Sequence, residues 1–387
     1  MNSFDEVFSY KNLYHSYRKC LKGVRWKGTV QNYEMNALSN LYTTYEELKK
    51  EEFKTGHFYQ FDIIERGKKR HIQSVGIRER VVQRCLCDYC LVPKLSSKFI
   101  FDNYACIEDK GHHFALRRMK YLLNRYYRKY KTNEGYILQY DFHHYFESIP
   151  HQELIKKISE LIADEKTLKL YIKLVNDFAG DKGIGLGSQI SQISALYYPN
   201  DLDHYFKGIK GIFAYGRYMD DGFLISNDKE LLKKCLRDLK ELCKKLDITL
   251  NENKTQIAKL NHGFTFLKAR FFLLDTGKVI MKPNRKSITR NRRKIKKLKK
   301  KGLPQEDLIK VINTLIGNLK HYNAFNTRRN LKMLKEEIIT LNGKDFMKHS
   351  SDRGRIVQVE TGLVFEEAID EIPCNFTYEE ENLEEEG

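Results

Sequence analysis

The chain has 387 residues, of which 41% are hydrophobic and 12% aromatic, so it can bury one large core or two to three smaller lobes and is not expected to be disordered. Basic residues exceed acidic ones by 18, and residues 360–387 hold eleven acids without a Lys or Arg, which leaves residues 1–359 at +29 and favours a polyanionic partner, most simply nucleic acid. Eight cysteines without a regular framework, and no N-terminal apolar segment typical of a signal peptide or membrane span, predict a reduced, cytoplasmic setting and no membrane partner.

The first part of the chain predicts helices followed by a basic strand. Residues 1–60 show short helical patterns without a chemical motif, and residues 61–92 pass from a basic, strand-like segment to an amphipathic helix. Cys85, Cys87 and Cys90 lie close enough in sequence to suggest a metal site. They fall within that helix and lack an obvious fourth ligand nearby, so we do not favour zinc there.

An acidic residue ends the next apolar segment. Residues 135–149, GYILQYDFHHYFESI, are aromatic and β-branched up to Asp141, which predicts a buried strand followed by polar residues. An acid just past a buried strand is firmly held and still accessible. Residues 152–176 then predict a helix, and residues 183–206 predict a glycine-rich turn that leads into another helix.

Two further acids stand in the segment IFAYGRYMDDGFLIS, residues 212–226, which predicts strand, tight turn and strand with Asp220 and Asp221 at the bend. Adjacent carboxylates in a poorly solvated bend repel one another, at a cost on the order of a few kcal/mol unless a cation offsets it. An isolated Asp-Asp is more often an exposed turn, but here apolar residues flank the pair and Asp141 lies upstream. Three carboxylates predict an oxygen-only site for Mg²⁺, or Mn²⁺, rather than zinc.

The remaining elements predict a basic, helical C-terminal lobe. Residues 228–246 form one amphipathic helical pattern, and strand-like and hairpin-like segments follow it. Twelve of the twenty residues from Lys282 to Lys301 are basic, and helical periodicity continues to about residue 338. The whole pattern is that of an α+β protein.

The tetrapeptide YMDD, together with YDFHHYFESIPH, resembles the polymerase palm of reverse transcriptases, and further motifs follow in the order of that family from about residue 60 to residue 325. The resemblance implies a right-hand polymerase with fingers, a palm of antiparallel sheet plus helices, and a helical thumb. The implied division is as follows: N-terminal extension 1–60, fingers 61–135, palm with an inserted helical segment 136–275, thumb 276–345, acidic tail 346–387.

The resemblance also assigns roles at the acids. It implies that Asp141, Asp220 and Asp221, with the backbone carbonyl of Phe142, hold two Mg²⁺ ions, roughly 3.5–4 Å apart in such sites, that serve phosphoryl transfer. Phe146, five positions after Asp141, matches the steric gate that excludes a ribose 2′-hydroxyl. Packing in the core is the plain alternative for this ring.

Three other stretches resemble nucleotide-contacting segments. GKKRHI resembles the fingers strand that grips the triphosphate, with Arg70 as the bidentate phosphate contact and Lys69 or Lys68 in support, unless these residues form a solvated basic turn. ITLNENKTQI supplies Lys254, which would act as general acid or charge stabiliser, unless it is merely solvated.

The third stretch, GIGLGSQISQ, implies nucleotide contacts from Leu186, Gly187 and Gln192. Many group II intron and retron enzymes have a QG...SP pattern here, whereas this variant resembles reverse transcriptases of diversity-generating retroelements and related bacterial enzymes, some of them antiviral. Residues 101–116 and LIGNLKHYNAFNTRR are similar to the same branch. Because Leu186 replaces a polar contact by an apolar one, we expect reduced fidelity, especially opposite template adenines.

Nucleic-acid contacts are expected from the basic segments. Arg78 and Arg80 fit template or phosphate contact, or else ion pairing with Glu79 or other neighbours. FTFLKARF resembles the primer-grip hairpin, although Lys268 stands where a glycine is usual. The expected thumb contacts to a template–primer duplex are Arg292, Arg293 and Lys296.

The resemblance therefore implies an RNA-directed DNA polymerase that uses dNTPs and a structured noncoding RNA as template, primer or both, with an accessory protein or homo-oligomer as further possible partners. Antiviral defence is the expected role, and error-prone copying in a diversity-generating retroelement is the alternative. Untemplated or protein-primed synthesis is a further alternative. A non-catalytic RNA-binding protein is disfavoured, because it has no need of paired buried carboxylates. The acidic tail could be a solvated terminus, shield the basic groove or contact a partner.

Overall fold

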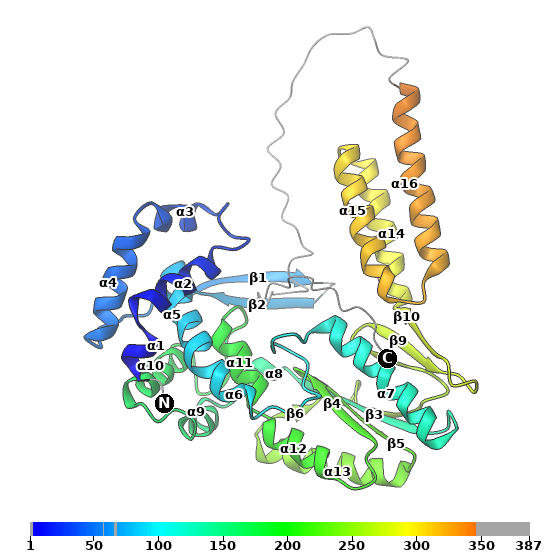
Figure 1. Cartoon of the computed structure of the whole chain (residues 1–387), viewed down its shortest axis with the longest axis horizontal. Helices are drawn as coiled ribbons and strands as arrows, with labels where there is room; N and C mark the ends of the chain where they lie inside the picture. The colour runs from blue at the N-terminus through cyan, green and yellow to red at the C-terminus, as the bar shows by residue number, and fades with distance from the viewer. Residues whose placement is uncertain (1–2, 57, 66–67, 346–387) are drawn as a thin grey trace, which may run out of the picture. The chain divides into compact units, whose positions relative to one another are not determined.

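The structure is a computed structural model that describes residues 3–56, 58–65 and 68–345, drawn in Figure 1. The described residues form two compact units. Unit 1 takes its described residues from 1–111 and 137–257, and unit 2 takes them from 112–136 and from 258 onward. The acidic tail, residues 346–387, lies outside the described residues, and the division into fingers, palm and thumb stays a prediction.

Unit 1 begins with the helices expected from the N-terminal pattern. They are α1 (Phe4–Val7), α2 (Tyr10–Cys20), α3 (Gly28–Met35) and α4 (Ala37–Lys49). In α2, Leu13, Tyr17 and Cys20 recur at helical spacing and are buried. Ser9 caps this helix by accepting a hydrogen bond from the Asn12 backbone N–H.

The basic strand-like segment is a hairpin rather than a single strand. It pairs β1 (Tyr59–Glu65) with β2 (Lys68–Ser74), and then leads into α5 (Ile77–Leu86), a π-helical turn (Cys87–Leu91) and α6 (Val92–Ser96). The clustered cysteines lie within this helical run, as expected, and are buried. Burial raises the pKa of Cys85 to about 12, so its thiol is protonated, and the thiol donates to the Val7 carbonyl at 3.1 Å.

An antiparallel sheet forms the centre of unit 1. Its strands run in the order β4 (Ala214–Tyr218), β5 (Asp221–Ser226), β3 (Tyr136–His143) and β6 (Thr249–Leu250), and β7 (Gln256–Lys259) also pairs with β3. Three helices lie early in this region: α8 (Tyr145–Ser148), α9 (His151–Ser159) and α10 (Glu165–Asn176). Three more follow: α11 (Gln189–Tyr197), α12 (Asn200–Gly208) and α13 (Lys229–Lys245). α12 packs on β4, and α13 packs on β5 (Figure 1).

Two expected single helices are each divided. Residues 152–176 form α9 and α10 because the Asp164 side chain caps a new helix, accepting from the Thr167 backbone N–H at 2.8 Å. Residues 183–206 form α11 and α12, with Pro199 at the break, since proline has no backbone N–H to continue a helix. The strand–turn–strand expected at residues 212–226 is confirmed as β4 and β5.

Unit 2 combines a long helix, a three-stranded sheet and a helical bundle. The helix is α7 (His112–Tyr130), and the sheet order is β10 (Val279–Pro283), β9 (Ala269–Leu273) and β8 (Phe264–Phe266). The bundle is formed by α14 (Arg285–Lys300), α15 (Gln305–Asn318) and α16 (Phe325–Asp345), which confirms the expected basic, helical lobe. Its core contains Ile295, Leu308, Ile312, Leu315, Leu331 and Ile338.

The hairpin between β8 and β9 forms despite the substitution noted at Lys268. Leu267 and Lys268 both take positive φ values, 45° and 65°, so the two-residue turn keeps the left-handed backbone that glycine would adopt more easily. None of the helices in the described parts of the chain is long and apolar enough to cross a membrane.

Candidate active site

The three predicted carboxylates meet where β3 approaches the turn between β4 and β5. Asp141 stands near the end of β3 and is 3% exposed, while Asp220 and Asp221 are half-buried at the turn. The Phe142 backbone N–H donates to the Asp220 carbonyl at 3.2 Å, which ties the strand to the turn. Met219, just before the acids, has a φ of +55°, an unfavourable left-handed conformation for a non-glycine residue.

Burial and neighbouring acids raise the pKa values of Asp220 and Asp221. Burial and then the charge of Asp141 raise the pKa of Asp220, although Lys254 and Arg70 oppose the rise. Burial, the charges of Asp220 and Asp141, and a hydrogen bond with Asp141 raise the pKa of Asp221 to about 8. The site therefore holds more carboxylates than its own cations compensate, which is the electrostatic condition for binding an added cation.

Asp141 is held by two residues from the segment after β6. Lys254 Nζ lies 2.6 Å from Asp141 Oδ2, and Asn251 Nδ2 donates to Oδ1 at 3.1 Å. Partial burial lowers the pKa of Lys254, but the hydrogen bond and charge of Asp141 outweigh this and raise it overall. Lys254 thus lies at the acids, and its expected action on the pyrophosphate stays a prediction. Asn251 was not predicted; its position directly after a short strand, three residues before Lys254, was the available signal.

The type of ligand fits a hard divalent cation, because all three candidate ligands are carboxylates. The side chains are not arranged as a complete metal site, however: in the described part of the chain, no set of three or more His, Cys, Asp or Glu side chains is placed so that it could hold a metal ion. Phe142 pairs with Leu250 of β6, beside the acids. The assignment of metal to Asp141, Asp220, Asp221 and the Phe142 carbonyl stays a prediction.

The fingers-like hairpin brings Arg70 into electrostatic reach of the acids. Arg70 stands on β2 opposite Ile63, and its charge lowers the pKa of Asp220. Lys69 instead reaches back to Asp62 on β1, with Nζ 2.9 Å from Oδ2, and His71 Nδ1 lies 3.0 Å from the other oxygen of the same carboxylate. Lys69 is therefore paired with Asp62, whereas the charge of Arg70 acts on Asp220.

The glycine-rich loop is joined to the same hairpin. The Gln73 backbone N–H donates to the Leu186 carbonyl at 3.0 Å, and Ile72 pairs with Leu186 as an isolated parallel bridge. Gly187 has a φ of +114°, and a Cβ there would lie 3.2 Å from the Gln73 carbonyl oxygen, so glycine is required. Gln192, on α11, accepts a weak hydrogen bond from the Cys106 thiol at 3.9 Å.

The candidate gate, Phe146, belongs to the short helix α8. This helix follows His144, which has a φ of +46°, and the Phe146 carbonyl accepts from the Ile184 N–H at 2.8 Å. The ring packs edge-on against Tyr145 with 5.9 Å between centroids and is only half-buried. Part of the ring is therefore accessible to a ligand, and α8 is tied to the glycine-rich loop.

The alternative of ion pairing applies to Arg78. Arg78 forms an ion pair with Glu47 of α4, donates to Thr44 Oγ1 at 3.2 Å and stacks over Phe53. The partner is Glu47 and not the adjacent Glu79, which is buried and accepts from the Gly56 N–H and Gln83. Template contact by Arg78 would require breaking this pair.

Arg80 also has a local partner, because its Nη2 donates to Ser74 Oγ at 3.1 Å, at the end of β2. Neither arginine of the IRER segment is therefore held ready for a phosphate in this structure.

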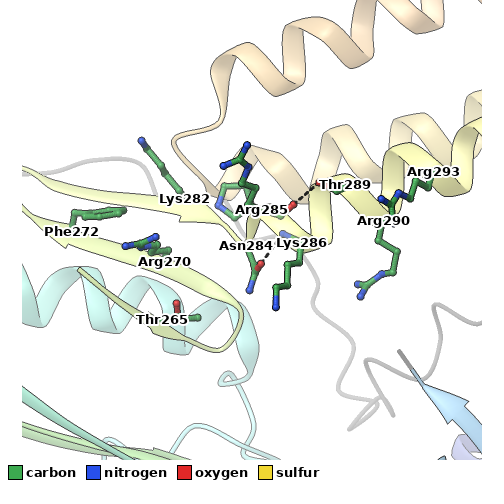
Figure 2. A pocket seen from close by; sticks show the side chains of 11 residues that line it. Thr265, Arg270, Phe272, Lys282, Asn284, Arg285, Lys286, Thr289, Arg290 and Arg293 are labelled. Carbon is green, nitrogen blue, oxygen red and sulfur yellow. Dashed lines mark hydrogen bonds between the residues drawn. The ribbon is translucent and has the colours of Figure 1, made fainter. Parts of the chain in front are cut away.

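Unit 2 contains an open hollow of about 950 Å³ lined largely by cations, which we call the basic hollow (Figure 2). Its lining residues are Thr265, Arg270, Phe272, Lys282, Pro283, Asn284, Arg285, Lys286, Thr289, Arg290 and Arg293. The Arg270 guanidinium lies 4.9 Å from the centroid of the Phe272 ring, and Lys282 Nζ lies 5.8 Å from it. Of the expected thumb contacts, Arg293 lines the hollow, whereas Arg292 and Lys296 lie exposed on α14 outside its lining.

A family model and known proteins match this chain. Residues 67–271, more than half of the chain, match the family model described as "Reverse transcriptase (RNA-dependent DNA polymerase)". Protein YkfC of Escherichia coli (strain K12) is 25% identical over 248 residues, which are 53% of this chain and 63% of YkfC. A solved structure of apo telomerase from Candida tropicalis, truncated from the C-terminal domain, is 15% identical with a TM-score of 0.46, over 64% of this chain and 60% of that one.

The chain thus spans less than two thirds of the length of both relatives. The family match, however, includes Arg70, the glycine-rich loop and all three clustered carboxylates. The mixed helical and antiparallel architecture agrees with the α+β right-hand polymerase fold. This chain belongs to the reverse transcriptase family.

Proposed function

We propose that the protein is an RNA-directed DNA polymerase that transfers nucleotidyl groups from dNTPs to a primer 3′-hydroxyl. The observation that carries the proposal is the meeting of Asp141, Asp220 and Asp221 where β3 approaches the turn between β4 and β5, with burial and mutual repulsion raising the pKa of Asp220 and Asp221. A carboxylate cluster of this kind destabilises the fold. A protein that only binds RNA has no use for such a cluster, whereas nucleotidyl transfer requires it.

The three carboxylates and the Phe142 carbonyl would hold two Mg²⁺ ions, for which Mn²⁺ could substitute. Bound there, the ions would supply Lewis-acid activation at the attacking oxygen and charge neutralisation at the leaving oxygen. Asn251 would hold Asp141 in orientation through its hydrogen bond to Oδ1.

Other residues of unit 1 would bind and orient the nucleotide. Arg70 would bind the triphosphate through its planar fork of donors, with Lys69 in support after release from Asp62. Lys254, at 2.6 Å from Asp141 and half-exposed, would place a proton or a positive charge at the leaving pyrophosphate. Phe146 would exclude a 2′-hydroxyl, and the loop with Leu186, Gly187 and Gln192 would contact the sugar and base.

The proposed partners are a structured noncoding RNA as template or primer and the nascent DNA, with an accessory protein or a second copy of the chain as further candidates. The basic hollow, with Arg292, Lys296 and Arg293 of α14, would contact the backbone of the duplex. We place this activity in the bacterial cytoplasm and favour a role in antiviral defence.

One residue favours the alternative role of error-prone copying in a diversity-generating retroelement. Leu186 puts a half-buried apolar side chain where a polar contact to the nucleotide would check its geometry. Sequencing of products from a defined template should show fewer errors for Leu186→Gln than for the wild type. Equal error rates would contradict this reading of Leu186. Untemplated or protein-primed synthesis remains the further alternative and would give DNA unrelated to any RNA present.

The direct test is purification of the full chain with its bound RNA, followed by addition of four dNTPs with Mg²⁺ or Mn²⁺ and sequencing of both RNA and DNA. Asp220→Asn should abolish synthesis, whereas Asp201→Asn, which changes an exposed carboxylate paired with Lys157, should retain it. DNA that matches the bound RNA would establish templated synthesis. Synthesis by Asp220→Asn equal to that of the wild type would refute the proposed site.

A further inference from the structure

A fully buried ion pair lies behind the catalytic turn. Arg217 on β4 and Asp203 on α12 are both completely buried, with Nη2 2.6 Å from Oδ2. A buried pair of this kind commonly adds little stability compared with apolar side chains of the same volume. Because stability does not explain the pair, its role depends on the groups near the acids that the guanidinium binds.

Arg217 uses each of its three nitrogens. Nε and Nη2 donate to the two carboxylate oxygens of Asp203 at 2.7 and 2.6 Å, which fixes the plane of the guanidinium. Nη1 then donates to the Met219 carbonyl at 2.7 Å, and Nη2 also donates to the Leu196 carbonyl at 2.8 Å. One side chain thus joins α12, the end of α11 and the turn that carries the acids.

The turn needs such support because Met219 has an unfavourable backbone conformation, with a φ of +55°. Conformations of this kind cost on the order of 1 kcal/mol and persist where their surroundings enforce them. Arg217 holds the carbonyl of Met219, and the Phe142 N–H holds the carbonyl of Asp220, so hydrogen bonds fix two consecutive peptide groups.

Asp203 is itself fixed by neutral donors. Tyr215 Oη donates to Oδ1 at 2.6 Å, and Asn103 Nδ2 donates to Oδ2 at 3.4 Å. Tyr140, the neighbour of Asp141 on β3, meets Tyr215 with 2.7 Å between hydroxyl oxygens. The cluster therefore reaches the strands that carry all three acids.

The cluster also accounts for a segment that the sequence pattern singled out without a role. Residues 102–104 run beside β4, where the Arg217 N–H donates to the Asp102 carbonyl and the Tyr104 N–H donates to the Arg217 carbonyl, each at 3.0 Å. Asp102 Oδ2 accepts from Lys207 of α12 at 2.9 Å. The backbone of Arg217 is thereby held on its outer edge.

We infer that Arg217, oriented by Asp203, is a positioning residue for nucleotidyl transfer. It holds the Met219 carbonyl so that Asp220 and Asp221 project toward Asp141, and through Leu196 it couples this turn to the helix that follows the glycine-rich loop. The inference rests on the proposed function and adds a residue that contacts neither nucleotide nor metal.

The test uses the double variant Arg217→Met/Asp203→Leu in the full chain. It removes both charges and leaves the Met219 carbonyl without its donor, so kcat should fall about tenfold or more at nearly constant KM for the primer in a protein that still folds, at lower thermal stability. Affinity for Mn²⁺ alone, measured by electron paramagnetic resonance without nucleotide, should fall in parallel.

The matched control is Arg84→Met/Asp88→Leu, which removes a buried ion pair with a 2.8 Å separation in α5 and the π-helical turn. It should leave kcat and Mn²⁺ affinity unchanged. A double variant at Arg217 and Asp203 that folds and keeps wild-type kcat and Mn²⁺ affinity overturns the inference. Should that variant fail to fold, Arg217→Lys retains the charge but not the fork of donors; it should show the same losses, and wild-type values in it would equally overturn the inference.

The proposed polymerase activity can be refuted independently of the role inferred for Arg217. If the wild type makes no DNA with any template, the proposed activity is refuted, while Mn²⁺ affinities of the wild type, the Arg217 variants and the control still decide whether Arg217 positions the acids.

Discussion

Gly222, directly after the paired acids, shows how tightly the hairpin that carries them is packed. A Cβ at this position would lie 2.1 Å from Cζ of Tyr140, inside the van der Waals radius of the ring. Tyr140 cannot retreat without disturbing its hydrogen bond to Tyr215. The glycine in the MDDG segment is therefore required by packing, even though its φ is not in the left-handed region.

We expect Gly222→Ala to destabilise the protein by on the order of 3 kcal/mol, because either the ring or the strand must move. Thermal unfolding of the purified variant measures this. Gly317→Ala is the matched control, since a Cβ there meets no atom within 4 Å and alanine favours the helix by about 1 kcal/mol. Equal unfolding temperatures for both variants would contradict the packing argument.

Lys254 offers a prediction about chemistry rather than folding. Lys254→Met should lower kcat about 10²-fold with little change in the KM for dNTP, because the lost ammonium acts on charge that develops at the leaving group. Lys254→Arg should retain more activity than Lys254→Met. Single-turnover nucleotide incorporation measures the effect, with Lys233→Met on the exposed face of α13 as control. Unchanged kcat in Lys254→Met would remove this residue from the mechanism.

The acids could be found from the sequence because each follows a local pattern: an apolar strand that ends in a carboxylate. The ion pair of Arg78 could not be predicted from such a local pattern. Its ion-pair partner, Glu47, stands 31 residues earlier in a helix without a chemical motif. Arg217 was hidden for the same reason, since a basic residue inside a strand gives no indication of the buried acid Asp203 on α12, the helix that packs on this strand.

At the scale of elements, helical periodicity identified where helices occur but not where they end. The break before α10 depends on one capping side chain, Asp164, whose polar character reads equally well as an exposed helical residue. β6 has only two residues because the chain turns after Asn251, whose carbonyl accepts from the Lys254 and Thr255 backbone N–H groups at 3.0 Å each. These turn hydrogen bonds override the local preference for strand.

A histidine at the start of α7 packs against a histidine of the 3₁₀ turn Leu319–His321, with consequences for acid stability. His113 packs against His321 with 4.1 Å between ring centroids. Burial, and then the neighbouring charges of His321, His112 and Arg117, lower the pKa of His113 to about 4. The folded state therefore keeps this ring neutral at a pH where an unfolded histidine, with a pKa of about 6.5, takes up a proton.

Since the unfolded state binds more protons between about pH 6.5 and pH 4, the stability of unit 2 should fall as the pH is lowered through this window. Urea unfolding followed at pH 7 and pH 5 should show a smaller loss for His113→Phe than for the wild type. His262→Phe, which changes an exposed histidine of the same unit, should behave like the wild type. An identical loss in His113→Phe would exclude this residue as the cause.

At the scale of the whole molecule, the excess of basic residues is concentrated rather than spread evenly. The cations of the basic hollow come from β9, β10 and α14, and Figure 2 shows Arg290 and Arg293 side by side along that helix. The composition predicted a polyanionic partner, but only the fold assembles residues from 265 to 293 around one hollow with the Phe272 ring among them.

If the basic hollow contacts phosphates, the double variant Arg290→Gln/Arg293→Gln should weaken binding of a template–primer duplex irrespective of its sequence. Its log–log salt dependence should become shallower by about 1 to 2, since each lost phosphate contact removes about 0.9 from the slope for a B-form duplex. Fluorescence anisotropy between about 50 and 200 mM salt measures this. Lys310→Gln, on α15 and paired with Asp307, is the control; an unaltered slope in the double variant would exclude the hollow.

The parts of unit 2 are synthesised at different times. α7 packs on β9 and β10, which lie on the order of 140 residues further along the chain. At roughly 5–20 residues per second, a ribosome needs about 7–28 s to make that intervening segment. During this time the apolar face of α7, with Leu116, Met119 and Leu123, has no strands to cover it. Nascent chains should accordingly depend on chaperones over this interval, and proteins that end before β9 should aggregate even though they contain all of the described residues of unit 1.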